Sequence, residues 1–317
     1  MSDSHSRPLA AMEGAPDEPV SGGFIALIGR PNVGKSTLLN ALIGSRLSIV
    51  TAKPHTTRQR ILGVVHREDG SQLAFVDTPG LHERRSRPLN RLMNDAARQA
   101  MHDADVILVL VDASRLSEDD ASVLEAAFDS GRPVVIGANK TDRVRPRDAL
   151  LPVLAELGAR WPAAAAIVPL SARRHDNLER LLDALVPLLP EGPALFPPDM
   201  ITDRDLAYRV AEQIREKLMI QLRDELPYGI AVTVEQLVRE QSGRWQVAAA
   251  IWVEQSRHKG MVIGRGGQLL KTVGTQARQA LIELLGGPVH LELWVQERRD
   301  WSRDERALRE LGYSGEG

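Results

Sequence analysis

Eight residues near the start of the chain have the types and spacing that bind a nucleotide phosphate chain. Residues 29–36 read G-x-x-x-x-G-K-S, after a short apolar run at 24–28 and before a segment of strong helix formers. Glycines let backbone N–H groups turn toward an anion, and the N-terminus of the next helix adds partial positive charge. Lys35 is expected to reach the β- and γ-phosphates and Ser36 to coordinate Mg²⁺. The predicted phosphate-binding residues are Gly29, Arg30, Pro31, Asn32, Val33, Gly34, Lys35, Ser36 and Thr37.

A second motif concerns the base. Residues 139–142 read N-K-T-D and follow the apolar run 133–137. The Asp142 carboxylate can accept hydrogen bonds from both N1–H and the 2-amino group of guanine, whereas adenine offers no such pair of donors. Asn139 is expected to tie the loop together, and Lys140 to lie over the ring. Ser171, Ala172 and Arg173 are placed for a backbone N–H to reach guanine O6. The predicted guanine-binding residues are Asn139, Lys140, Thr141, Asp142, Ser171, Ala172 and Arg173.

A third group of residues has the types that contact Mg²⁺ and the γ-phosphate. Asp77, at the end of an apolar run, is expected to meet Mg²⁺ through water, and the Gly80 N–H to sense the γ-phosphate. The polar loop 45–60 holds Thr56 and Thr57, one of which should coordinate Mg²⁺. We favour Thr57, and Thr56 is the alternative because one sequence does not determine the register. Loops held only by the γ-phosphate and Mg²⁺ relax on hydrolysis and so act as switches.

Metal binding and catalysis share residues in these predictions. The predicted metal ligands are Ser36, Thr57 and Asp77, and the predicted catalytic residues are Lys35, Thr57 and Gly80. Thr78, Pro79 and Leu81 complete the predicted GTP-binding set.

Leu81 stands where many switch GTPases carry a glutamine that orients water. An apolar side chain cannot polarise water, which predicts slow intrinsic hydrolysis and another means of placing the water. His82 is one candidate, although an exposed loop histidine is the simpler interpretation. Arg84 and Arg85 follow, but nothing in the sequence aims either at the γ-phosphate, so no arginine finger is assigned.

The elements that must position these residues alternate between strands and helices. Apolar runs predict strands at 24–28, 60–67, 73–76, 106–111, 133–137 and 167–170. Helical patterns lie at 88–102, 117–130, 149–159 and 177–189. This alternation predicts an α/β domain with a parallel sheet between helices, and ligands bind at the carboxyl ends of such strands.

Length and composition allow two domains. The chain has 317 residues, a formal net charge of −2 and no cysteine, so disulfides, thiol nucleophiles and cysteine metal sites are excluded. No apolar run approaches the ~20 residues that span a bilayer. Residues 1–21 are expected to form a disordered extension rather than a signal peptide, 22–189 the first domain, 190–203 a proline-rich linker and 204–317 the second domain.

The second domain has a different pattern, with the order α-β-β-α-loop-α-β. A helix is predicted at 203–223, two strands at 230–234 and 247–253 joined by a hairpin at Gly243, a long helix at 269–285 and a last strand at 289–295. Residues 261–263 are expected to form a short apolar turn before the glycine loop.

That loop, G-R-G-G at 264–267, has the G-x-x-G pattern that clamps the backbone of single-stranded nucleic acid in KH domains. From Gln255 to Ile282 there are five basic residues and no acidic one, although residues 201–317 as a whole carry no net charge. Such segregation suits a groove that tracks phosphates. The predicted RNA-binding residues are Arg257, Lys259, Met261, Ile263, Gly264, Arg265, Gly266, Gly267, Lys271 and Arg278.

The chain resembles the Era family of bacterial GTPases over about residues 22–313. The shared segments are GRPNVGKSTLLNALIG, TTR, DTPGLH, NKTD and SA in the first domain, and ITDRD, EKLM, ELPY, MVIGRGG, PVHLELWV and DERALRELGY after it. The resemblance implies a P-loop NTPase G domain followed by an α+β type II KH domain, with GTP, GDP and Mg²⁺ as ligands. It implies binding to the 3′ end of 16S ribosomal RNA and a role in 30S subunit assembly. It also implies a cytoplasmic location with peripheral association at the inner face of the cell membrane, and we expect a monomer.

Three other functions are compatible with parts of this sequence. A GTPase whose KH-like domain contacts a protein instead of RNA is the main alternative, and the intact G-x-x-G argues against it. A GTP-dependent RNA-modifying enzyme of the related kind would need a C-terminal cysteine, which is absent. Asp142 argues against an ATP-dependent kinase.

Overall fold

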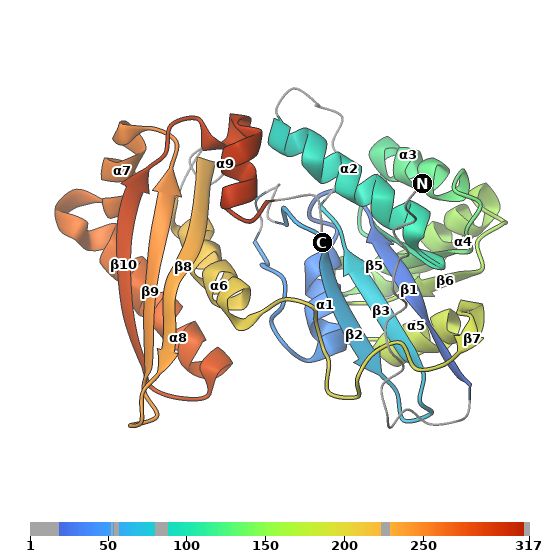
Figure 1. Cartoon of the computed structure of the whole chain (residues 1–317). Helices are drawn as coiled ribbons and strands as arrows, with labels where there is room; N and C mark the ends of the chain where they lie inside the picture. Colours follow the sequence, from blue (N-terminus) through green and yellow to red (C-terminus); the bar gives the residue numbers. More distant parts are fainter. Residues whose placement is uncertain (1–18, 52, 54–56, 80–87, 223–228, 314–317) are drawn as a thin grey trace, which may run out of the picture.

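The computed structural model describes residues 19–51, 53, 57–79, 88–222 and 229–313, with the backbone alone at 88–92 and 94. Figure 1 shows two domains side by side, with the chain passing from one to the other before helix α6. The first domain is a twisted sheet between two layers of helices. In the second, helices pack against one sheet of three strands.

Six strands of the first domain lie in the order β2-β3-β1-β4-β5-β6, and β2 alone runs antiparallel to its neighbour. Their continuous apolar runs, such as β4, leave both faces buried, as parallel sheets require. A short strand, β7, pairs antiparallel with the start of β1. The strands are β1 (Val20–Ile28), β2 (Ile61–His66), β3 (Gln72–Asp77), β4 (Val106–Asp112), β5 (Val134–Asn139), β6 (Ala166–Pro169) and β7 (Glu191–Gly192).

Helices cover both faces of this sheet. Buried leucines of α1 and α5 pack with Ile25 and Leu27 on one face, while α2, α3 and α4 pack with Ala26 and Ile28 on the other. The helices are α1 (Lys35–Ile43), α2 (Pro88–Asp103), α3 (Glu118–Phe128), α4 (Leu150–Arg160) and α5 (Leu178–Leu185). Single 3-10 turns occupy Thr141–Arg143, Arg147–Ala149 and Val186–Leu188.

The second domain carries its sheet in the order β10-β9-β8, with β10 parallel and β8 antiparallel to β9. Its core joins Ile214 of α6, Val262 of α7 and Ala277 of α8 to the inward residues of the strands. The elements are α6 (Leu206–Gln221), β8 (Ile230–Arg239), β9 (Trp245–Val253), α7 (Ser256–Ile263), a 3-10 turn (Arg265–Gly267), α8 (Gln268–Leu285), β10 (Val289–Glu297), a second 3-10 turn (Trp301–Arg303) and α9 (Glu305–Glu310).

Three elements differ from the sequence-based expectation. β1 begins at Val20, inside the segment expected to be a disordered extension, because Val20 and Ser21 pair with β7 of the linker. Residues 261–263 are the last turn of the eight-residue helix α7 rather than a short turn. Helix α9 follows the last strand, where no helix was predicted.

The two domains meet along the polar loop 45–60 and helix α2. Arg209 of α6 donates a hydrogen bond of 3.2 Å to the Ser45 hydroxyl, and the Lys53 ammonium donates to the carbonyls of Met219 and Leu222 at the C-terminal end of α6. Cations are stabilised at that end of a helix, where carbonyl groups lack partners. The described residues of loop 45–60 are therefore bound by the second domain as well as by the first, to which the loop belongs.

Among the helices that the structure describes, none has the length and apolar character needed to cross a bilayer.

Candidate nucleotide and RNA sites

The loop at 29–36 has the backbone that an anion cradle needs. Gly29 and Gly34 adopt φ of 154° and 108°, and a Cβ on Gly29 would lie 2.6 Å from the Leu110 carbonyl oxygen. Asn32 also has positive φ, at 62°. Only glycine fits both the conformation and the space at position 29.

Lys35 lies inside this loop and is 7 % exposed. Its ammonium donates hydrogen bonds of 2.7 Å to the Gly29 carbonyl and 3.2 Å to the Arg30 carbonyl. Burial lowers the pKa of Lys35 to about 8, while the charge of Asp77 acts in the opposite direction. A cation held in this way has its charge ready for a bound phosphate.

The three predicted magnesium ligands converge on one point. The Ser36 hydroxyl lies 2.9 Å from the Thr57 hydroxyl and donates a 2.8 Å hydrogen bond to Oδ2 of Asp77. Oδ1 of Asp77 is buried and has no hydrogen-bond partner within the described part of the chain. Burial raises the pKa of Asp77, against the opposing effects of Lys35 and three hydroxyls, among them that of Ser48. Two hydroxyls and an unpartnered carboxylate oxygen fit the oxygen-rich ligand set of Mg²⁺.

Asn139 connects the phosphate loop to the loop after β6. Its amide donates 2.8 Å to the Val33 carbonyl, and its carbonyl accepts 3.0 Å from the Ala172 N–H. Because Asn139 is 2 % exposed, these bonds lie away from water and hold the two loops in register.

The base-recognition residues Lys140 and Asp142 are held from neighbouring loops. The Ser171 hydroxyl donates a hydrogen bond of 2.7 Å to the Asp142 carboxylate. The Lys140 ammonium donates one of 2.7 Å to Asp112 and one of 2.6 Å to the Asn32 carbonyl. Burial of Asp112 is outweighed by hydrogen bonds from Lys140 and Ser114, so the Asp112 pKa falls below its usual range.

A cavity of about 460 Å³ joins these parts. Its lining includes Asn32, Gly34, Lys35, Ser36, Thr37, Thr57, Asn139, Lys140, Asp142, Ala172 and Arg173 from the predicted set. It also includes Ile49, Val50, Thr51, Lys53 and Arg143, which the motifs missed; the signal for the first four was the polar loop 45–60 as a whole.

Some predicted residues lie elsewhere. Arg30 donates a hydrogen bond of 2.7 Å to Asp120 of α3 and one of 3.0 Å to the Arg115 carbonyl in the segment before that helix. Thr78 donates 3.0 Å to the Leu27 carbonyl, and Thr141 donates 3.1 Å to the Leu170 carbonyl, so both serve the framework. Pro79 is buried next to Thr78. Thr56, Gly80, Leu81, His82, Arg84 and Arg85 lie outside the described residues.

In the second domain the G-x-x-G loop lies between α7 and α8. Gly264, Gly266 and Gly267 have φ of 77°, 60° and 75°, and a Cβ on Gly266 or Gly267 would meet nothing within 4 Å. Gly266 and Gly267 therefore present backbone that no side chain covers to a ligand. At Gly264 an added Cβ would lie 2.6 Å from Leu269, so only glycine fits there.

The predicted RNA-binding side chains surround this loop. The five cations Arg257, Lys259, Arg265, Lys271 and Arg278 are exposed, and none forms an ion pair with another described residue. Met261 is 53 % exposed, and Ile263 is half-buried against the core. Unpaired cations beside exposed glycines can bind a phosphate backbone.

A P-loop nucleotide site and a KH-type glycine loop thus stand in one chain, which defines a GTPase joined to a nucleic-acid-binding domain. Residues 24–140 match the family model for a 50S ribosome-binding GTPase, and residues 225–302 match that for a KH domain. The chain belongs to the Era family of GTPases.

Similarity to that family extends over both domains. GTPase Era of Xylella fastidiosa (strain M12) is 45 % identical over 291 residues, which cover 92 % of this chain and 97 % of the relative. GTPase Era of Haemophilus influenzae (strain PittGG) is 45 % identical over 294 residues, covering 93 % and 97 %. A crystal structure of Era in complex with MgGDPNP and nucleotides 1506–1542 of 16S ribosomal RNA has a TM-score of 0.88 and 39 % identity, covering 93 % of this chain and 99 % of that one. A crystal structure of an Aquifex aeolicus Era variant bound to GDP·AlF4⁻ has a TM-score of 0.87 with the same identity and coverage.

Proposed function

We propose that the chain hydrolyses GTP and that its nucleotide state controls binding of its KH domain to the 3′ end of 16S ribosomal RNA, in support of 30S subunit assembly. The observation that carries the proposal is the combination of a cavity lined by Lys35, Asn139 and Asp142 with the exposed G-x-x-G loop and its unpaired cations. In the domain plan we propose, residues 22–189 form the G domain, 190–203 the linker and 204–317 the KH domain with its tail.

The nucleotide residues divide into three tasks. Asp142, held by Ser171, accepts the guanine donors, and Asn139 keeps the phosphate loop and the loop after β6 together. The backbone of 29–36 receives the phosphates. Ser36, Thr57 and Asp77 would hold Mg²⁺, which supplies positive charge beside the β- and γ-phosphates when bound.

Hydrolysis is attack of water on the γ-phosphorus in line with the bond to the β–γ bridging oxygen. That bond breaks, and GDP and phosphate leave. Lys35 stabilises the charge that grows on the transferring oxygens, and the Gly80 N–H is proposed to do the same from its own loop. With Leu81 instead of a glutamine beside it, the intrinsic rate is slow.

The test measures binding of a labelled RNA that has the sequence of the 16S 3′ end. Fluorescence anisotropy reports the binding at one stated salt concentration. It is run with GDP, with a non-hydrolysable GTP analogue and without nucleotide. Tighter binding with the analogue than with GDP supports the proposal and gives the coupling between the two sites. Failure to bind in any state overturns the RNA assignment and favours a protein partner for the KH domain.

The remaining proposals rest on the family resemblance. They are association with the 30S subunit, a cytoplasmic location with peripheral contact to the membrane, and a monomeric state. Co-sedimentation with 30S particles tests the first, flotation with vesicles of bacterial lipids the second, and equilibrium sedimentation the third.

A further inference from the structure

The segment after β10 belongs to neither site, yet it carries the largest fully buried side chain of the described protein, Trp301. The Trp301 indole N–H donates 3.2 Å to the Gly229 carbonyl, and its ring stacks on Tyr313 with centroids 5.6 Å apart and an interplanar angle of 17°. We call this pair the Trp301–Tyr313 stack. It lies where the KH domain meets the G domain.

Loop 45–60 reaches this stack through the residue next to a predicted magnesium ligand. Arg58 is 5 % exposed, and its guanidinium carbon lies 5.8 Å from the centroids of both rings. It donates 2.6 Å to the Ile230 carbonyl and 3.2 Å to the Tyr313 hydroxyl. Thr57 and Arg58 are consecutive, so a movement of Thr57 that accompanies Mg²⁺ binding or release would be passed to Arg58 through one peptide bond.

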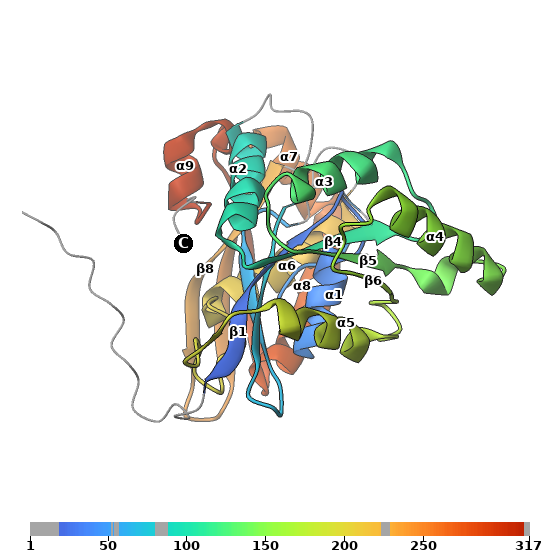
Figure 2. The same cartoon turned by 90° about the vertical axis from the view of Figure 1, so that its right-hand side faces the viewer.

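Helix α2 reaches the same stack from the other side. Met93 is 1 % exposed and packs in one apolar cluster with Ala231, Trp301, Leu308 and Leu311. Figures 1 and 2 both show α9 lying beside α2. α2 begins at Pro88, eight residues after Gly80, the predicted sensor of the γ-phosphate. The two segments expected to respond to the nucleotide, loop 45–60 and the chain leading into α2, therefore both lead to Trp301.

From the stack, contacts continue toward the RNA clamp. The Ser302 hydroxyl donates to the carboxylate of Glu254, and the Arg298 N–H donates 2.9 Å to the Val253 carbonyl. Glu254 lies two residues before α7, which carries Arg257 and Lys259 and leads into the G-x-x-G loop.

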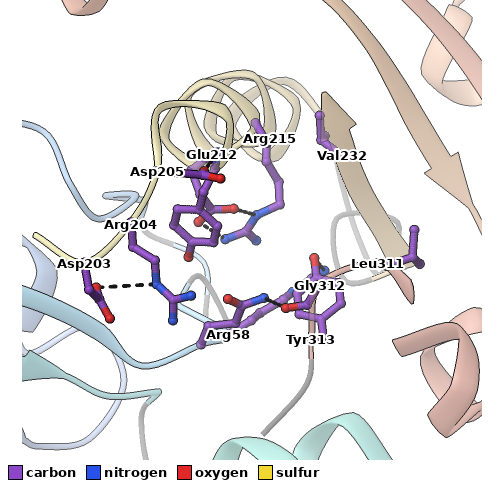
Figure 3. Close-up of a pocket in the computed structure, with 13 residues that line it drawn as sticks. Arg58, Asp203, Arg204, Asp205, Glu212, Arg215, Val232, Leu311, Gly312 and Tyr313 are labelled. Atoms are coloured by element: carbon purple, nitrogen blue, oxygen red, sulfur yellow. Dashed lines mark hydrogen bonds and ion pairs between the residues drawn. The ribbon is translucent and has the colours of Figure 1, made fainter. Parts of the chain in front are cut away.

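The surroundings of Arg58 leave room for a second arrangement. Beside it lies a polar cavity of about 310 Å³, lined on the other side by Arg204, Glu212 and Arg215 (Figure 3). In Figure 3, Arg58 lies near Tyr313 and Gly312, across the cavity from the α6 side chains. An interface with a cavity is not close-packed, so its side chains can be rearranged without opening a packed core.

We propose that the Trp301–Tyr313 stack is the receiver through which both nucleotide-dependent segments set the RNA clamp, and that Arg58 is the positioning residue of loop 45–60 in this transfer. The inference rests on the proposed function, because it names the path of the regulation proposed there. The nucleotide state moves Arg58 and Met93, these shift the stack, and Ser302 passes the shift to Glu254 and α7.

The first test needs no RNA. Hydrogen exchange of the peptide covering 298–313 is measured in the full chain with GDP and with the GTP analogue, in the parent, in Arg58→Met and in Arg67→Met. Arg67 is the matched control. It follows the last residue of β2, at the opposite end of that strand from Arg58, and it pairs with Asp183 of α5. We expect exchange to differ between the nucleotides in the parent and in Arg67→Met, and the difference to vanish in Arg58→Met. Equal exchange in the parent, or an unchanged difference in Arg58→Met, overturns the proposal.

The second test measures the coupling itself, as the ratio of RNA dissociation constants with GDP and with the analogue. A ratio in the usual range of about 5 to 150 in the parent should fall to about 1 in Arg58→Met, with GDP affinity within about threefold of the parent. Met93→Ala gives an independent route to the same loss from the α2 side. An undiminished ratio in both variants overturns the path. If the parent protein binds no RNA, the proposed function is wrong and the coupling ratio cannot be measured. The hydrogen-exchange measurement then still tests whether loop 45–60 acts on the Trp301–Tyr313 stack.

A general loss of folding would be visible in both tests. Tyr313→Phe removes one hydroxyl and keeps the stack, so it should retain the parent melting temperature while lowering the coupling ratio. A merely structural role for Arg58 would lower stability and leave the ratio intact, which would also overturn the proposal.

Discussion

The Ser171 hydroxyl donates a hydrogen bond of 2.7 Å to the Asp142 carboxylate, joining the loop after β6 to the base-recognition loop after β5. One carboxylate oxygen is thereby held, so the side chain is oriented before guanine arrives. Orientation in advance reduces the entropy lost on binding.

Asp142→Asn tests the guanine assignment. Loss of two hydrogen bonds to a charged acceptor should weaken GTP binding by about 100-fold or more, while xanthosine triphosphate, which presents a carbonyl in place of the 2-amino group, should bind better than GTP. Ser171→Ala keeps the carboxylate and should weaken GTP by only about fivefold. Competition between the two nucleotides gives the result, and an unchanged preference for GTP in Asp142→Asn would contradict the assignment.

Thr57→Ala tests the metal site and decides between the two threonines. Loss of a ligand should lower kcat for GTP by about 100-fold and raise the Mg²⁺ concentration needed for half-maximal rate. Thr56→Ala is the matched control and should hydrolyse GTP as the parent does. A large loss in Thr56→Ala with a normal Thr57→Ala would reverse the choice.

Nucleotide affinity should depend on the charge of Lys35. Because the pKa of the nucleotide-free protein's Lys35 is lowered to about 8, GDP affinity should decline as the pH rises through that value. The pH dependence of stability has the opposite sign. Between pH 8 and the ordinary pKa of 10.5 the unfolded chain binds more protons than the native one, so this group makes stability rise with pH. Titrations with a fluorescent GDP between about pH 6.5 and 9 measure the first effect, and Lys35→Met should bind weakly with a flat profile across the range.

Aspartates in the glycine loop test the RNA clamp. Gly266→Asp and Gly267→Asp place a negative charge and a side chain on exposed backbone and should reduce RNA affinity at least about 100-fold at low salt. Gly243→Asp is the control, because Gly243 also has positive φ and open space but lies in the β8–β9 hairpin. GTP binding should be normal in all three variants. Equal losses of RNA affinity at position 243 would mean that strain, not the clamp, is responsible.

The motifs located the nucleotide cavity because its chemistry is local in sequence. Lys35 and Ser36 end a G-x-x-x-x-G-K-S pattern, whose spacing indicates phosphate binding. Asp142 lies three residues after Asn139, which ends β5. The role of Arg30 was not deducible in this way. Its guanidinium finds Asp120, which lies 90 residues away and has no motif of its own.

In the second domain, too, local patterns were predictable from the sequence and long-range contacts were not. The β8–β9 pair and α8 were predictable from their periodicity, whereas α7 presents exposed polar side chains over its first turns and buries only Val262, so its helical pattern is weak. The contact of Arg58 with Tyr313 spans 255 residues and depends on how two domains pack, which no local pattern encodes.

The linker is itself bound along the G domain. The Gln72 side chain accepts from the Leu195 and Phe196 N–H groups at 2.7 and 3.0 Å, and the Val64 N–H donates 3.0 Å to the Ile201 carbonyl. Few residues then separate the last anchor from α6, so the KH domain is held on a short tether. Surfaces that never drift far apart meet at high effective concentration, and individually weak contacts suffice to rejoin them. Contacts as few as those of Arg209 and Lys53 can therefore keep the two halves in one register.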